Sequence, residues 1–210
     1  MDGLSIFIAN GGDATRVSSV ASFFVSRIDT LIDDLVTRRV EQATDASERA
    51  LLTGLLGRVA IANARLAYQR YLTLCRTPAW QTLAAKGARP QRLLWASTST
   101  KNVRYRDVRY VEELIGGYTV TTVTPKTIDA FRDHGRPRAS LEEDLDDASR
   151  VLDTLDRVGI SLSAVTDKLL TDGVTQFCTA FDNVLAATQH MIDGPRDTAS
   201  PTVRSEVSPW

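Results

Sequence analysis

The feature that most constrains the fold is a short apolar run, Leu93 to Ala96, that leads directly into a hydroxyl-rich segment. That segment, residues 97–101, reads Ser-Thr-Ser-Thr-Lys and so ends in a cation. Pro90 restricts the backbone at the entry, and helical spacing of apolar residues resumes only at Val108. The pattern predicts a buried strand whose carboxyl end delivers hydroxyl groups and a lysine to a polar site. A solvated loop after an edge strand is the alternative for the serines and threonines alone.

Two further stretches have the composition of buried strands. Val20 to Val25 is apolar almost throughout and is mixed with small residues, and Thr119 to Val123 is β-branched throughout. Strands of this kind are buried on both faces and belong to parallel sheets covered by helices. Each is followed by residues with helical spacing, so the sequence predicts an α/β fold.

Helical patterns fill most of the remaining chain. We expect a helix end at Gly3–Ala9, which looks like the last turns of a helix whose beginning is absent. A longer helix should begin at about Ser26-Arg27 and run to Val40. Further helical segments are expected at Ser47–Arg76 (bent at Gly54 or Gly57), Trp80–Lys86, Val108–Ile115, Pro125–His134, and from a capping box at Ser140–Glu143 onward to Leu185. Residues 1–192 are therefore assigned to one folded region, and the Pro- and Ser-rich residues 193–210 are predicted to be a disordered tail.

Composition excludes several classes of partner. The net charge is −1 and the pI about 6.1, so no footprint for nucleic acid exists. No apolar run approaches the ~18 residues of a membrane span, and the start of the chain lacks the basic region of a secretory signal. Cys75 and Cys178 both lie in apolar helical patterns, which predicts buried thiols in a reducing compartment, with a disulfide as the less favoured alternative. We therefore expect a cytoplasmic protein with no nucleic-acid or membrane partner.

Hydroxyl groups and cations follow two of the predicted strands. Ser22, Ser26 and Arg27 accompany the first, and Ser97 and Lys101 follow the second. Ligands of α/β proteins bind at the carboxyl ends of strands, where helix N-termini also favour an anion. A phosphate pocket is one interpretation. The other is that Arg27 pairs with Asp29 or Asp33 on the surface.

Lys101 admits a second interpretation, as a nucleophile that forms a Schiff base. The chain has four lysines, and the other three fall on predicted helices or loops with charged surroundings. Against this, residues 97–102 contain no acidic side chain to shuttle protons.

His134 and His190 are isolated, and the sequence contains no metal-ligand spacing, no glycine-rich phosphate loop and no nucleophile elbow. We therefore expect no metal.

Several long motifs closely resemble bacterial transaldolases of the longer type. They are Ser19–Thr30, Ala60–Gln69, Gly87–Arg92, Leu94–Asn102 and Tyr110–Gly116, and they occur in the family's order from near the N-terminus to about residue 190. The resemblance implies a (β/α)8 TIM barrel that transfers a dihydroxyacetone unit from sedoheptulose 7-phosphate to glyceraldehyde 3-phosphate in the pentose phosphate pathway. This reaction proceeds through a lysine Schiff base and without a cofactor.

By that resemblance the three strands are the sixth to eighth of the barrel, with a helical insertion between the sixth and seventh. Ser22, Arg27, Ser97 and Lys101 match the family's substrate- and phosphate-binding positions. The family's Schiff-base lysine and its acid–base carboxylates would precede Met1, so no catalytic residue is assigned here. The chain departs from its relatives at Val103, commonly proline, and at Thr121, commonly asparagine.

The resemblance implies a transferase whose isolated carboxyl-terminal part is inactive. The alternative is a non-catalytic remnant or sugar-phosphate-binding module. Expected partners are sugar phosphates and either a complementing amino-terminal half or further copies of the chain. A three-stranded sheet with open edges should also leave the isolated chain molten, aggregated or dimerised.

Overall fold

The computed structural model describes residues 1–193. The chain divides into two compact units, Met1–Leu169 and Leu170–Trp210. The first unit contains the sheet and the helices that pack on it. The described part of the second unit is the continuation of one long helix.

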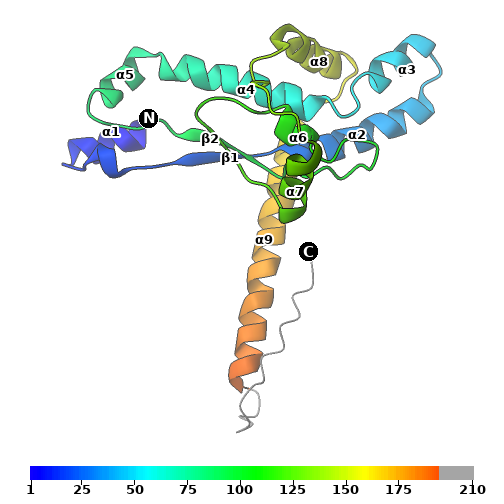
Figure 1. Cartoon of the computed structure of the whole chain (residues 1–210). Helices are drawn as coiled ribbons and strands as arrows, with labels where there is room; N and C mark the ends of the chain where they lie inside the picture. The colour runs from blue at the N-terminus through cyan, green and yellow to red at the C-terminus, as the bar shows by residue number, and fades with distance from the viewer. Residues whose placement is uncertain (194–210) are drawn as a thin grey trace. The chain divides into compact units, whose positions relative to one another are not determined.

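A three-stranded parallel sheet organises the first unit (Figure 1). Its strands are β1 (Val20–Phe24), β2 (Arg92–Ala96) and β3 (Thr119–Thr121), and their order is β1-β2-β3. Phe24 pairs in register with Ala96, and Trp95 pairs with Thr121. The three strands predicted from the sequence are therefore present, although β3 ends two residues early.

Helices make up most of the remaining described residues. They are α1 (Asp2–Ala9), the 3-10 turn η1 (Ala14–Arg16), α2 (Val25–Gln42), α3 (Ala46–Thr53), α4 (Val59–Cys75), α5 (Pro78–Ala84), α6 (Arg109–Glu112), α7 (Pro125–His134), α8 (Leu145–Arg157) and α9 (Leu162–Asp193). The alternation of parallel strands with helices confirms the α/β class.

The strands are covered on one face only, contrary to the prediction that both faces are buried. Trp95 is fully buried on the covered face and makes an edge-to-face contact with Phe23, with 5.6 Å between the ring centroids. Side chains of α2, α4 and α8 supply much of the rest of this core, together with buried residues such as Leu52 of α3 and Tyr110 of α6. On the opposite face Val20 and Phe24 are 41% and 39% exposed. The apolar composition of the strands was correctly identified, but the helices pack against one side of the sheet.

The long helical region predicted over residues 47–76 is two helices. The break between α3 and α4 contains Gly57 with φ of +66°, a left-handed conformation that glycine adopts at little cost. A Cβ atom at this position would lie 2.5 Å from the ring of Tyr105. The glycine therefore lies in the turn between the two helices, directly before the N-cap of α4, and admits a close neighbour.

The capping box predicted at Ser140 is wrong, since α8 begins only at Leu145. Ser140 is fully buried, and its hydroxyl donates to the carbonyl of Glu112 and accepts from the amide of Ile115. The Ser140 hydroxyl is therefore used in tertiary hydrogen bonds and is not available to cap a helix. Asp144, at φ of +50°, precedes the helix instead.

Helix α9 carries a row of large apolar side chains that are exposed in the second unit. They are Leu170, Val174, Phe177, Phe181, Val184, Leu185, Met191 and Ile192. Cys178 is also exposed and Cys75 is half-buried, so the prediction of two buried thiols is wrong. Of the predicted tail, Asp193 is the last residue of α9, and residues 194–210 lie outside the described part of the chain.

Candidate functional site

The carboxyl ends of the three strands meet at one edge of the sheet because the strands are parallel. Helix α2 begins at Val25, directly after β1, and its first turn has no side-chain cap. The hydroxyl segment 97–100 follows β2 and residues 122–124 follow β3. The predicted polar segment therefore does lie at the carboxyl end of a strand.

Ser97 is fastened to the first turn of α2. Its hydroxyl lies 2.7 Å from that of Ser26, and its carbonyl accepts a hydrogen bond of 3.0 Å from the Ser26 amide. Ser97 has φ of +56°, which is uncommon for a residue other than glycine. The two bonds to Ser26 offset this strain and fix where the hydroxyl segment leaves β2.

The next two hydroxyl groups hold the ends of the strands together. Thr98 is buried and donates to the carbonyl of Thr122 at 2.6 Å. The hydroxyl of Ser99 lies 2.8 Å from that of Thr127 and 3.2 Å from that of Thr124, at the start of α7. These two side chains are thus committed to structural contacts.

Arg27 lies over an aromatic ring. Its guanidinium carbon is 5.0 Å from the centroid of the Phe24 ring. The surface ion pair with Asp29 or Asp33 is not formed, since both carboxylates bind other groups. Within the described residues, no carboxylate lies within ion-pair distance of Arg27, which leaves its charge available to a ligand.

Lys101 is exposed and lines a cavity of about 230 Å³. The other walls of this cavity come from α2 and from the two tyrosines that follow Lys101, and include Asp29, Asp33, Tyr105 and Tyr110. The structure therefore brings carboxylates close to Lys101 that are absent from the local sequence. Asp29 and Asp33 are four residues apart and so lie on one face of α2. This spacing was the only sequence pattern that could have indicated a paired acidic group.

Asp29 is the most perturbed carboxyl group at this cavity. It is 1% exposed, and burial raises its pKa to about 6, although hydrogen bonds from the Ala60 amide and the Tyr110 hydroxyl oppose the rise. The same burial, together with the negative charge of Asp29, raises the pKa of Tyr110. Both groups are bonded within the protein and hold the chain after Lys101 in place.

Of the four predicted site residues, Ser22 alone lies within a strand and not after its carboxyl end. It lies in the middle of β1, exposed on the open face of the sheet with Val20 and Phe24, and its register partner is Leu94. The structure thus joins Ser97 to Ser26, places Arg27 beside Phe24, and sets Lys101 among the carboxylates of α2.

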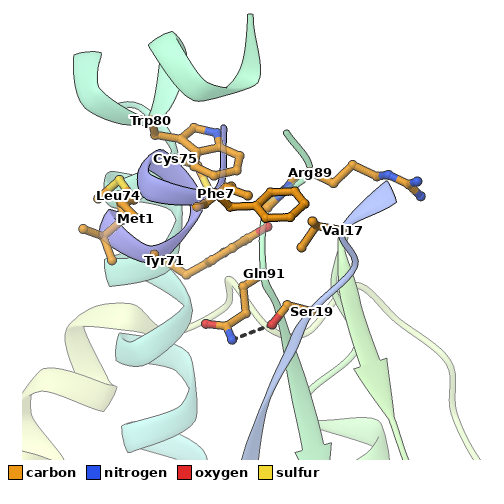
Figure 2. Close-up of a pocket in the computed structure, with 13 residues that line it drawn as sticks. Met1, Phe7, Val17, Ser19, Tyr71, Leu74, Cys75, Trp80, Arg89 and Gln91 are labelled. Atoms are coloured by element: carbon orange, nitrogen blue, oxygen red, sulfur yellow. Dashed lines mark hydrogen bonds between the residues drawn. The ribbon is translucent and has the colours of Figure 1, made fainter. Parts of the chain in front are cut away.

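A further cavity, of about 550 Å³, lies at the amino ends of the strands (Figure 2). Val17 and Ser19 precede β1 and Arg89 and Gln91 precede β2, so this cavity is at the end of the sheet opposite the predicted site. Its walls are largely apolar. Burial raises the pKa of Tyr71, one of its lining residues, to about 12.

The described residues form no cluster of metal ligands. Within residues 1–192, no three side chains of His, Cys, Asp or Glu are grouped as metal ligands would be. None of the helices described is both long and apolar enough to cross a lipid bilayer.

Residues 8–188 match the family model described as Transaldolase/Fructose-6-phosphate aldolase. The chain belongs to this family. The resemblance drawn from the sequence motifs is thereby confirmed, and the observed parallel strands and helices agree with it.

Three similar proteins carry the name transaldolase. A transaldolase of Trichodesmium erythraeum is 41% identical over 194 residues, which is 91% of this chain and 51% of that protein. One of Thiobacillus denitrificans is 46% identical over 184 residues, or 88% and 49% of the two chains, and Transaldolase 2 of Nostoc punctiforme is 44% identical over 193 residues, or 90% and 51%. The chain spans about half the length of the curated relatives it matches.

Proposed function

We propose that this chain is the carboxyl-terminal part of a transaldolase. The reaction is transfer of a dihydroxyacetone unit from sedoheptulose 7-phosphate to glyceraldehyde 3-phosphate, in the cytoplasm and without a cofactor. The family match over residues 8–188 and the 41–46% identity to transaldolases support this proposal. On this view β1, β2 and β3 are the last three strands of a (β/α)8 barrel, and α3, α4 and α5 form an insertion.

The proposed role of the strand ends is to anchor the phosphate of the sugar. Arg27 carries this proposal, because its guanidinium lies on the first turn of α2 and none of the described carboxylates is at ion-pair distance from it. A helix N-terminus and an arginine both favour an oxyanion. Ser97, bonded to Ser26 in the same turn, supplies a hydroxyl. Ser22 and Lys101 complete the proposed set.

The catalytic groups of this reaction would come from the half of the relatives that this chain does not span. In the described sheet β1 and β3 each pair only with β2, so each offers an open edge to a complementing amino-terminal half. The alternative is a non-catalytic sugar-phosphate-binding module. All four lysines of this chain are exposed, which fits both alternatives, since neither takes its Schiff-base amine from this chain.

Complementation tests this proposal. We would co-express the chain with the amino-terminal half of the Trichodesmium erythraeum relative and measure transfer to glyceraldehyde 3-phosphate. Transfer should be recovered, and Arg27→Ala and Lys101→Ala should each raise KM about ten- to hundredfold, since each removes a charge-assisted contact. Arg132→Ala, which removes an exposed arginine paired with Asp129, is the matched control. Recovered transfer with unchanged KM in both variants would refute the phosphate assignment.

A further inference from the structure

A third cavity, which is rich in arginine, lies on the helices of the first unit, and none of Ser22, Arg27, Ser97 and Lys101 lines it. It has a volume of about 200 Å³ and lies between the first turns of α4 and α8 and the segment around α6. Three arginines line it, Arg58, Arg65 and Arg109. We propose that this cavity binds a phosphate group, either as inorganic phosphate or as the monoester of a small metabolite.

Arg65 is a buried cation with unused hydrogen-bonding capacity. The residue is 6% exposed, and its Nε atom is buried with no hydrogen-bond partner. A single protein contact, of 2.7 Å from Nη2 to Glu113, is formed by this guanidinium within the described residues. Because the Nε atom has almost no accessible surface, an acceptor in the cavity would have to be met by the terminal nitrogens of Arg65.

Arg109 has no carboxylate partner at ion-pair distance in the part of the chain that the structure describes. Its guanidinium carbon lies 4.9 Å from the centroid of the Tyr105 ring, which holds the group in place by a cation–π contact. A stacked guanidinium keeps its in-plane N–H donors available. This geometry suits two-pronged binding of an oxyanion.

Two helix N-termini flank the cavity. Arg58, Ile61 and Ala62 belong to the start of α4, and Asp147 and Ala148 belong to the start of α8. Neither helix has a side-chain hydrogen bond at its N-cap. Figure 1 shows α8 lying beside α4. The start of α4 already binds the carboxylate of Asp29 through the Ala60 amide, and the first turn of α8 contains Asp146 and Asp147. The arginines, and not the helix dipoles, therefore supply the attraction for an anion here.

The carboxylates that line the cavity are already neutralised. Glu113 is shared by Arg65 and Arg138, and Asp147 is shared by Arg58 and Arg150. The hydrogen bond from Arg58 is the main cause that lowers the pKa of Asp147. The lining thus contains three arginines against two carboxylates, each of which has a second arginine partner. A doubly charged phosphate complements this excess of positive charge.

Hydrogen–deuterium exchange of the purified full chain tests the proposal, with inorganic phosphate as the probe and chloride at equal ionic strength as the reference. Phosphate should slow exchange in peptides covering residues 58–65 and 145–151. Arg109→Gln should weaken the apparent affinity about tenfold or more, since one charge-assisted contact is lost. Because Arg65 is buried and its variants are at risk of misfolding, Arg109 is the informative position.

Two control variants separate phosphate binding in this cavity from phosphate binding elsewhere on the chain. Arg132→Gln, at an exposed arginine of α7, should leave the protection unchanged, and so should the double variant Arg27→Gln, Lys101→Gln at the proposed substrate site. Glycerol 3-phosphate in place of phosphate distinguishes the two sources, since a metabolite site should bind the monoester more tightly. Protection no greater than in chloride, or equal affinity in Arg109→Gln, would refute the proposal.

Discussion

The buried carboxylate of Asp29 accepts a hydrogen bond of 2.8 Å from the hydroxyl of Tyr110. Its other oxygen accepts from the amide of Ala60 at the start of α4, also at 2.8 Å. Asp33, one turn later on α2, repeats the arrangement with Tyr105 and the amide of Gly57. Two carboxylates of one helix thereby fasten both α4 and the segment that follows Lys101.

Removing the Tyr110 hydroxyl should destabilise the fold. In Tyr110→Phe the buried Asp29 loses one of its two hydrogen bonds, which should lower the free energy of unfolding by about 1–3 kcal/mol at pH 7. Urea titration followed by circular dichroism measures the loss. Tyr118→Phe, at a tyrosine 76% exposed, should change nothing. Equal midpoints for the two variants would contradict the assigned role of Tyr110.

The raised pKa of Asp29 predicts a particular pH dependence of stability. The folded state holds this proton up to about pH 6, whereas the ordinary pKa is 3.8. The contribution of protonated Asp29 to the free energy of unfolding is therefore complete below about pH 3.8, and it is lost as the pH rises through about 6. Between these two pH values the free energy of unfolding of the wild type should fall by on the order of 2–3 kcal/mol relative to that of Asp29→Asn.

Urea titrations from pH 4 to 7 on both proteins measure this difference. Asp34→Asn, at an exposed carboxylate of the same helix, is the matched control and should give a nearly flat difference. A flat difference for Asp29→Asn as well would show that Asp29 titrates alike in the folded and unfolded chain.

Gly57→Ala should be strongly destabilising. The position has φ of +66°, and an added Cβ would meet the Tyr105 ring at 2.5 Å. Strain and displacement of Tyr105 from Asp33 should together cost more than about 1 kcal/mol. Gly173→Ala, in α9 with nothing within 4 Å of the added atom, should leave the unfolding midpoint unchanged or raise it. Comparable losses in the two variants would disprove the special role of Gly57.

The strands were predictable because their signals are local. An apolar run ended by polar or turn-forming residues identifies β1, β2 and β3 without reference to the rest of the chain, and Gly57 marks the break between α3 and α4. The exposure of Val20 and Phe24 was not predictable in this way. Their exposure depends on whether helices cover one face of the sheet or both, and the apolar composition of the strands does not distinguish these two cases.

The candidate site was predicted in part for the same reason. Placement of Ser97 and Lys101 after β2 follows from the order of the chain. The contact between Asp29 and Tyr110 joins residues 81 positions apart, and only the packing of α2 on the following segment creates it. Ser140 shows the converse, since a valid local capping pattern lost to tertiary hydrogen bonds with Glu112 and Ile115.

The isolated chain should form no Schiff base. All four lysines (Lys86, Lys101, Lys126 and Lys168) are exposed, and none lies in the desolvated pocket that an amine nucleophile needs. Borohydride reduction in the presence of fructose 6-phosphate, followed by intact-mass measurement, should give no adduct. The full-length Trichodesmium erythraeum relative serves as the positive control. An adduct mapped to Lys101 would instead make that residue the nucleophile, with the nearby carboxylates of α2 as its proton shuttle.

The isolated chain should also self-associate through its sheet. Strands β1 and β3 are the two edges, and the open face exposes Val20 and Phe24 beside one of them. Unpaired backbone groups next to an apolar face pair readily with another copy, because the association satisfies the edge and buries that face at once. Sedimentation velocity should therefore give a mass that rises with concentration.

Self-association could also proceed through the exposed apolar side chains of α9, and a lysine on the edge strand β1 distinguishes the two contacts. Val20→Lys places a charge on β1 and should shift the distribution towards the monomer, since charged side chains are a common protection of edge strands. Val103→Lys adds the same charge at a side chain 99% exposed in a loop and should leave association unchanged. If both variants associate as wild type does, the sheet edge is not the contact. A sharp, cooperative melt of a concentration-independent monomer would show that the chain closes its sheet by itself.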